Sequence, residues 1–315
     1  MAALSGLSAR TRGALGALAG ALVLGATIAT VGTGAFLRGL SSLSAATIGI
    51  AVLLAALATA AAAWRWRTVA AGLGLRLPFF AAATGYYRSQ FLNSVLPGGV
   101  IGDVHRAYRH GRRAGRVALA ARAVAMERIA GQVVQLAIVA IVLGTLGITS
   151  PLRAIAWVVV GVVTLLVITL AVLAATARGR RMLQRELDLL RRVFSSGRRS
   201  LQIVTSSVVI VACHATTFVV ACLATGVRAT PRELVALALV ALTAGSIPLS
   251  LGGWGPREAG SAAAFALAGL GAAAGLAAST AFGVLTMIAL LPGAIVLVAD
   301  RIHPTASIIR EETTA

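Results

Sequence analysis

Charged residues are scarce in this chain, because Asp, Glu, Lys and Arg together make up only 12% of its 315 residues. Soluble domains carry about 25% charged residues, whereas 58% of this sequence is hydrophobic and its mean hydropathy is +0.92. The composition therefore excludes an ordinary soluble globular protein. Seven stretches without a charged side chain are long enough for a transmembrane helix, which needs about 20 apolar residues: 13–37, 39–64, 129–152, 154–177, 200–227, 234–256 and 259–299.

Lysine is absent, so all 28 basic residues are arginines, and the formal net charge is +19. Such a charge often indicates nucleic-acid binding, but these arginines lie between hydrophobic stretches, where membrane topology and anionic lipid headgroups account for them. We therefore expect no nucleic-acid partner. The longest charged connection, 178–199, is shorter than the roughly 50 residues of a small domain, so we expect a single transmembrane domain over residues 1–315.

Cysteine and recognised catalytic motifs are equally rare. Cys213 and Cys222 are the only cysteines, and their spacing of nine residues places them on opposite sides of a helix, which argues against a disulfide between them. The sequence contains no Walker A, HExxH or GxSxG pattern, each of which indicates a specific catalytic chemistry. We expect no metal, no cofactor and no enzymatic activity.

The hydrophobic stretches predict an all-α polytopic membrane protein with about six spanning helices, over 14–36, 43–63, 120–146, 152–175, 201–225 and 273–298. Two further segments, about 77–116 and 232–271, are interrupted by proline and glycine, which break helices. The interrupting residues, which we expect to form hinges of broken helices, are Pro97, Gly98, Gly99, Gly102, Pro248, Gly252, Gly253 and Gly255.

The distribution of arginines predicts an orientation. With a cytoplasmic N-terminus, 20 arginines lie on the inner side and four, Arg38, Arg153, Arg228 and Arg232, on the outer side, in agreement with the positive-inside rule. Both interrupted segments must then cross the membrane an even number of times, as re-entrant hairpins or as pairs of full spans, and both termini are cytoplasmic. As re-entrant hairpins they are antiparallel, which is the geometry of an inverted repeat in a transporter.

A shorter segment, about 182–194, has an amphipathic pattern, because Leu183, Leu187, Leu190 and Phe194 recur at helical spacing among charged residues. Its basic flanks favour a helix that lies on the cytoplasmic membrane surface against anionic headgroups.

Three acidic residues lie inside the predicted membrane region, and each has an arginine within three residues along the chain. An ionisable residue at membrane depth usually faces a partner or a cavity and marks a functional site. The candidate substrate-binding or transport residues are therefore Asp103, Arg106, Glu127, Arg128, Arg257 and Glu258. Adjacent residues project about 100° apart on a helix, so we expect Arg257 to pair with Glu127, and Glu258 with Arg128, across helices.

A polar stripe accompanies these charges. Arg128, Gln132 and Gln135 recur at helical spacing beside Gly131, which predicts a polar face toward the bundle interior. The two glycine-rich turns expose backbone N–H groups at new helix starts, where anions bind, and arginine binds phosphate through two hydrogen bonds. A phosphate-bearing ligand is therefore expected.

Three ordered segments, 96–106, 126–131 and 247–258, read LPGGVIGDVHR, MERIAG and IPLSLGGWGPRE. They resemble the signature blocks of the lysylphosphatidylglycerol synthase transmembrane family, also called flippase-like proteins, and the resemblance spans nearly the whole chain. It implies a stand-alone membrane domain without the cytosolic aminoacyltransferase half that bifunctional members carry. The Glu-Arg and Arg-Glu pairs of the family fall on Glu127, Arg128, Arg257 and Glu258.

The resemblance implies a translocator that moves an anionic phospholipid or a polyprenyl-phosphate-linked glycolipid across the cytoplasmic membrane, with membrane lipids as partners. The main alternative is a noncatalytic membrane partner of a cell-envelope glycosyltransferase or lipid synthase. A third hypothesis, an intramembrane lipid enzyme that uses Asp103, His105 or Glu258 as acid–base groups, has no catalytic motif to support it.

Overall fold

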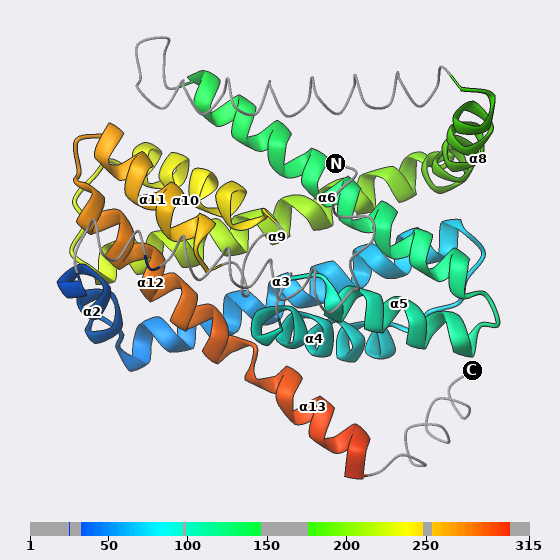
Figure 1. The fold of residues 1–315 in the computed structure, drawn as a ribbon, viewed down its shortest axis with the longest axis horizontal. Coiled ribbons are helices and arrows are strands. Elements are labelled where there is room, and N and C mark those ends of the chain that lie inside the picture. Colours follow the sequence, from blue (N-terminus) through cyan, green and yellow to red (C-terminus); the bar gives the residue numbers. More distant parts are fainter. Residues whose placement is uncertain (1–24, 26–32, 97–98, 146–175, 248–253, 303–315) are drawn as a thin grey trace.

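The computed structural model describes residues 25, 33–96, 99–145, 176–247 and 254–302, which fold into helices and turns without a strand (Figure 1). Four of the described segments are long and apolar enough to cross a membrane: α3 (Ala45–Gly72), α6 (Val117–Thr145), α9 (Gly197–Ala224) and the segment Ala272–Ala299. The predicted all-α membrane architecture is confirmed. The predicted span over 152–175, and most of the one over 14–36, lie outside the described residues.

The last of these spans is interrupted near its middle. α12 (Ala272–Ala289) and α13 (Leu291–Ile302) lie on either side of Leu290, because Pro292 has no backbone N–H to continue the helical hydrogen bonds. Gly293 lets α13 approach α4 closely, since a Cβ there would lie 2.3 Å from the carbonyl oxygen of Tyr87. At the other end of this span, the short helix α2 (Thr33–Ser41) packs against α12.

Both interrupted segments form helical hairpins. The first pairs α4 (Phe79–Val95) with α5 (Ile101–Arg113), and the second pairs α10 (Pro231–Gly245) with α11 (Pro256–Leu267). These helices have 17, 13, 15 and 12 residues, fewer than the about 20 that a full span needs, which favours re-entrant hairpins. Of the predicted hinges, Pro97, Gly98, Pro248, Gly252 and Gly253 lie outside the described residues.

The two hairpins are antiparallel, as predicted. Figure 1 shows the α4–α5 hairpin opening toward the end of the bundle near α8, and the α10–α11 hairpin opening toward the opposite end. α6 contacts both hairpins, because it packs against α5 and against α10.

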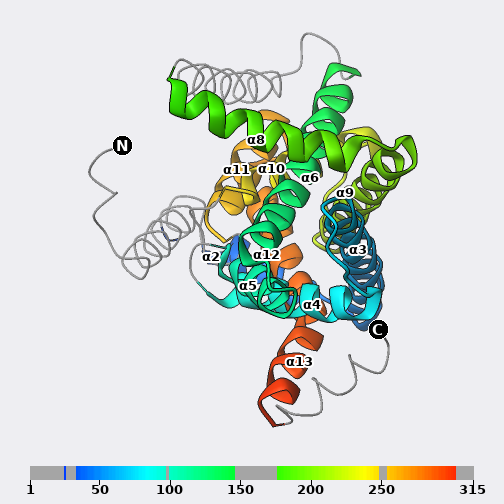
Figure 2. The same cartoon turned by 90° about the vertical axis from the view of Figure 1, so that its right-hand side faces the viewer.

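One end of the bundle carries most of the exposed arginines, and α8 (Ala177–Phe194) lies across it, crosswise to α3 and α9 (Figure 2). This helix covers the segment 182–194, for which a helix was predicted, and begins earlier. Its buried Val193 packs in a core with Val69 of α3 and Ile203 of α9. We call this the arginine-rich end, after its exposed side chains Arg67, Arg76, Arg112, Arg113, Arg116, Arg122, Arg180, Arg181, Arg185, Arg191, Arg192 and Arg198.

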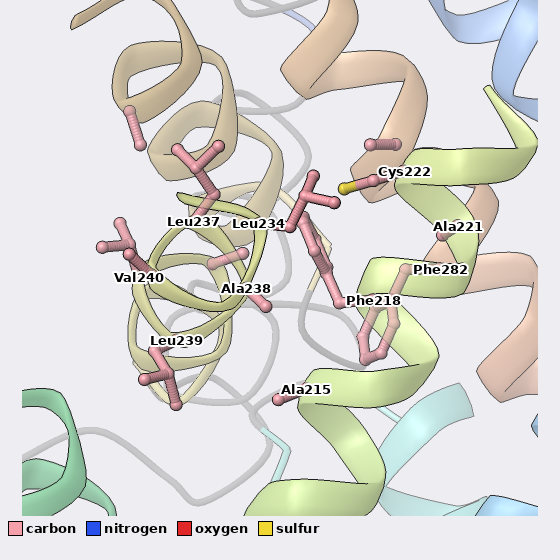
Figure 3. Close-up of a cluster of buried hydrophobic side chains, with 14 of the residues drawn as sticks. Ala215, Phe218, Ala221, Cys222, Leu234, Leu237, Ala238, Leu239, Val240 and Phe282 are labelled. Carbon is pink, nitrogen blue, oxygen red and sulfur yellow. The ribbon is translucent and has the colours of Figure 1, made fainter. Parts of the chain in front are cut away.

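The main hydrophobic core lies between α9, α10 and α12 (Figure 3). Leu234 of α10 points toward Cys222 of α9, and Phe282 of α12 lies beside Phe218 of α9, with ring centroids 5.5 Å apart. Cys213 and Cys222 are both buried and free, so no disulfide joins them in this structure. This core fixes Phe282, and Phe282 in turn contacts one of the charged clusters described next.

Candidate functional site

Five helices meet at a buried cluster of charged side chains beside the first hairpin. Its centre is Glu127 of α6, which is completely buried. Arg65 of α3 donates from Nε to Glu127 Oε1 at 2.7 Å, and Arg106 of α5 donates from Nη2 to Oε2 at 2.7 Å. The Tyr86 hydroxyl of α4 donates to Oε1 at 2.9 Å. Arg65 also donates to Ser207 Oγ of α9 at 2.9 Å, so Glu127 and Arg65 together link five helices.

Asp103 of α5 is the second carboxylate of this cluster. Its Oδ1 accepts hydrogen bonds from Arg106 Nε at 2.9 Å and from Ser89 Oγ at 3.1 Å. Its Oδ2 accepts from Asn93 Nδ2 at 3.2 Å and from Arg128 of α6. Because Ser89 and Asn93 belong to α4, Asp103 holds the two helices of the hairpin together. It also neutralises part of the positive charge of Arg106 and Arg128.

The turn of the first hairpin places Asp103 in this position. Gly102 lies against α4, since a Cβ there would be 2.0 Å from the Ser89 carbonyl oxygen, and its N–H donates to Asn93 Oδ1 at 2.7 Å. Gly99 has a φ of 61°, a left-handed conformation that costs glycine little. The turn therefore requires glycine at both positions.

Aromatic rings and a glycine surround the buried guanidinium groups. The guanidinium carbon of Arg106 lies 4.7 Å from the ring centroid of Trp66 and 4.2 Å from that of Tyr86, close enough for cation–π attraction. Gly131 of α6 leaves room for Arg65, because a Cβ at residue 131 would lie 2.5 Å from Arg65 Nη1.

We name the group Arg65, Asp103, Arg106, Glu127 and Arg128 the first cluster. It holds three arginines and two carboxylates, and therefore one excess positive charge.

The exposed member is Arg128, whose side chain is 48% accessible and whose ion pair with Asp103 is its only one among the described residues. Arg128 lies eleven residues after the start of α6 at Val117, or about 16 Å along the helix. A half-exposed guanidinium so far inside a spanning helix is costly, which makes Arg128 a candidate for binding an anion in addition to Asp103.

The second cluster lies at the start of α11 and consists of Arg257 and Glu258. Arg257 Nε and Nη2 both donate to Glu258 Oε1, at 3.0 Å and 2.6 Å. Ser279 Oγ of α12 donates to the same oxygen at 3.0 Å, and Oε2 accepts from the Gly255 N–H at 2.7 Å. Arg257 is 5% exposed and Glu258 is fully buried. In contrast to the first cluster, this pair is neutral and enclosed.

The surroundings of Arg257 explain its fixed position. Its guanidinium carbon lies 5.0 Å from the ring centroid of Trp254 and 5.1 Å from that of Phe282. A Cβ at Gly283 would lie 2.4 Å from Arg257 Nη2, so glycine is needed there. Gly255 has a φ of 100°, and this left-handed conformation turns its N–H toward Glu258.

Neither cluster resembles a metal centre. Within the described part of the chain, no three His, Cys, Asp or Glu side chains are placed to hold a metal ion. Both oxygens of Asp103, Glu127 and Glu258 already accept hydrogen bonds. The arrangement suits the binding of an anion by the surplus arginine rather than the ligation of a cation.

Both clusters and both hairpins lie within residues 13–293, which match the family model described as the lysylphosphatidylglycerol synthase TM region. The chain belongs to this family. It is therefore a membrane protein related to lipid biology. No curated protein and no solved structure matches the chain.

The cross-helix pairs predicted for the family's Glu-Arg and Arg-Glu motifs are wrong. Glu127 pairs with Arg65 and Arg106, and Arg128 pairs with Asp103. Arg257 and Glu258, although adjacent, pair with each other. The reason is local, because Glu258 turns back to accept from the N–H of Gly255, the residue before α11, and the long Arg257 side chain follows it and lies near the rings of Trp254 and Phe282.

The polar stripe predicted on α6 faces the interior only in part. Gly131 is buried, whereas Arg128 and Gln132 are exposed. Gln135 donates to Thr243 Oγ1 of α10 at 3.4 Å, so the stripe reaches the second hairpin at this residue.

The sequence patterns do not indicate several hydrogen-bond partners in the two clusters, among them Arg65, Tyr86, Ser207 and Ser279. The predicted span ends at residue 63, before the first charge, and therefore leaves Arg65 in a connecting segment. In the structure α3 continues to Gly72 and includes Arg65. No proline or glycine stands between Ala63 and Gly72, and this pattern indicates that the helix continues past residue 63. The three hydroxyl residues carry no comparable pattern, since isolated hydroxyls are common in apolar helices.

Proposed function

We propose that this protein is a lipid translocator that moves an anionic phospholipid or a polyprenyl-phosphate-linked glycolipid across the cytoplasmic membrane without altering it chemically. The observation that supports this function most directly is Arg128. Its guanidinium is half exposed deep in a spanning helix, and its single carboxylate partner, Asp103, is shared with Arg106. A headgroup phosphate has the charge and the geometry to complete this site.

The hydrogen bonds of Asp103 make Arg128 the member of the first cluster that is free to exchange partners. If a phosphate replaces Asp103 at Arg128, Asp103 keeps its bonds from Arg106, Ser89 and Asn93. No buried carboxylate is then left without a donor, so the exchange avoids the cost of an unpaired buried charge. A headgroup with one net negative charge also cancels the excess charge of the cluster.

The surface around Arg128 suits a lipid whose tails stay in the bilayer. Val104 of α5 is 65% exposed, and Ile129 and Val133 of α6 are 60% and 61% exposed. These side chains offer an apolar surface on the two helices that hold the ion pair between Asp103 and Arg128. In this proposal the headgroup enters sideways from the membrane and the acyl chains remain in lipid.

In this proposal the second cluster belongs to the hairpin that serves the other side of the membrane. The Arg257–Glu258 pair is neutral and enclosed, and its hairpin opens toward the end opposite to that of the first hairpin. Antiparallel broken helices of this kind support alternating access in transporters. We assign the arginine-rich end to the cytoplasm by the positive-inside rule, so the two hairpins would serve the two leaflets in turn.

The test is transbilayer movement of fluorescent phosphatidylglycerol and of a fluorescent polyprenyl phosphate in vesicles that contain the purified protein. Wild type is compared with Arg128→Gln and with the control Arg122→Gln, which removes an exposed arginine from the same helix. We expect wild type to move at least one of the lipids, Arg128→Gln to slow it about tenfold or more, as loss of a charged hydrogen bond predicts, and the control to change the rate less than about twofold.

Mass spectrometry of the recovered lipid separates translocation from catalysis. An unchanged lipid supports a translocator, and a modified lipid would replace the proposal by an enzyme. The proposal is also overturned if wild-type vesicles behave like protein-free vesicles with both lipids, or if Arg128→Gln and Arg122→Gln move lipid equally fast.

A further inference from the structure

An open pocket with a volume of 720 Å³ lies at the arginine-rich end, away from both charged clusters. It is formed where the C-terminal end of α3 meets the turn between α8 and α9. Three arginines line it, Arg191, Arg192 and Arg199, together with Ser195 and the small residue Gly72. The proposed translocation site uses none of these residues.

Hydrogen bonds hold the basic wall of this pocket in place. Arg199 donates from Nη1 to the carbonyl oxygen of Arg192 at 3.0 Å and from Nη2 to Ser195 Oγ at 3.1 Å. Gly72 brings α3 against this wall, because a Cβ there would lie 3.0 Å from Arg199 Nη1 and 3.0 Å from the Cα of Val193. The pocket is therefore a built feature of the fold, in which at least one guanidinium is oriented.

The positive charge of the pocket is largely uncompensated. Asp188 lies 3.4 Å from Arg191, and both side chains of this pair are mostly exposed. Arg192 and Arg199 make no ion pair within the described residues. Arg192 and Arg199 thus both line one pocket without a carboxylate partner, and a phosphate group is the chemical class that such arginines recognise best.

The position of the pocket selects a lipid as the source of that phosphate. The residues that line the pocket lie at the end of the membrane-spanning helices α3 and α9. Figure 2 shows α8 crossing the bundle at this end. At this end of the spanning helices, anionic lipid headgroups are the phosphate groups that a basic pocket meets.

We propose that this pocket binds the phosphate headgroup of an anionic phospholipid from the surrounding leaflet, as a resident lipid separate from any lipid bound at Arg128. The inference holds whether or not the protein moves lipid. The bound lipid would fix the α8–α9 turn to the membrane surface through Arg192 and Arg199.

Lipid retention measured by native mass spectrometry tests this site. The purified protein is incubated with equal amounts of phosphatidylglycerol and phosphatidylcholine that have the same acyl chains, and is then exchanged into uncharged detergent. The pocket variant is Arg192→Gln with Arg199→Gln. The matched control is Arg180→Gln with Arg181→Gln, which removes two exposed arginines from α8 outside the pocket.

Wild type is expected to retain phosphatidylglycerol in preference to phosphatidylcholine. The pocket variant should lose roughly tenfold or more of this preference, since each arginine at a membrane surface contributes a factor of about five, and the control should lose less than about twofold. Equal losses in the two double variants, or no preference in wild type, would overturn the proposal. If the double variant unfolds, the single variant Arg192→Gln decides, because this side chain makes no hydrogen bond with the described residues and its loss should leave the fold intact.

Discussion

Arg106 of α5 and Glu127 of α6 form an ion pair in which Nη2 and Oε2 are 2.7 Å apart and both side chains are fully buried. Removing two charges from water is costly, so a buried pair is maintained only when further hydrogen bonds satisfy it. Glu127 has these bonds from Arg65 and Tyr86. The stability of the first hairpin therefore depends on this carboxylate more than on any exposed charge.

Replacement of Glu127 by glutamine should destabilise the protein strongly. The variant leaves Arg65 and Arg106 buried without their shared carboxylate, and loss of one partner of a buried pair costs about 3 to 5 kcal/mol. Thermal unfolding in detergent measures the effect as a lower Tm. The control is Glu186→Gln, which removes the partner of Arg122 in a pair whose side chains are 44% and 31% exposed and should cost no more than about 1 kcal/mol. Similar Tm values for the two variants would contradict the central position of Glu127.

Gly131→Ala should also lower the Tm, although alanine is the better helix former. A Cβ at residue 131 would lie 2.5 Å from Arg65 Nη1, so the arginine must move away from Glu127. Overpacking of this kind costs about 1 to 3 kcal/mol. Gly144→Ala is the matched control on the same helix, because a Cβ at residue 144 meets nothing within 4 Å, and it should be neutral or stabilising by up to about 1 kcal/mol. An unchanged Tm for Gly131→Ala would show that Arg65 can shift without loss.

Local sequence predicts the helices of this protein, but it does not predict the partners of the buried charges. Hydropathy and the positions of proline and glycine predict the described spanning helices and both hairpins, and the distribution of arginines predicts the opposite directions of the hairpins, because these features depend on local composition and on the membrane. The buried charges at Asp103, Glu127 and Glu258 were found in the same way, since each is costly in an apolar segment. Their partners could not be found, because pairing depends on which helix faces meet.

Arg65 and Arg257 illustrate this limit. Arg65 reaches Glu127 from 62 positions earlier in the chain, and no pattern in either helix indicates that contact. Arg257 pairs with its neighbour Glu258 against the expectation from helical angles, because the helix begins at Pro256 and the side chains bend toward Ser279 and the Gly255 N–H. Helix periodicity predicts Cβ directions well but predicts the ends of long charged side chains poorly.

The N-terminus of α10 should depend on pH through Glu233. Hydrogen bonds from the backbone N–H and the hydroxyl of Thr230 hold the pKa of the Glu233 carboxyl below its ordinary value of 4.5. A carboxyl whose pKa is lowered by folding stabilises the folded state above the ordinary value, and this contribution is lost as the pH falls through the lowered value. The Tm difference between wild type and Glu233→Gln should therefore be present at pH 7 and shrink as the pH is lowered below about 4. A difference that stays constant down to acid pH would contradict the role of the ionised carboxylate.

Double-mutant cycles can decide between the local and the cross-helix partner of Arg257. The variants are Arg257→Gln, Glu258→Gln and Glu127→Gln, singly and in pairs, and the measured quantity is the free energy of unfolding in detergent and denaturant. Arg257 and Glu258 share hydrogen bonds of 3.0 Å and 2.6 Å, so their cycle should give a coupling of about 1 kcal/mol or more. Glu127 belongs to the first cluster and has its own arginines. Its cycle with Arg257 should therefore be additive within about 0.5 kcal/mol. The opposite result, coupling with Glu127 and additivity with Glu258, would mean that the two clusters exchange partners in the membrane and that the enclosed Arg257–Glu258 pair is only one state of the second hairpin.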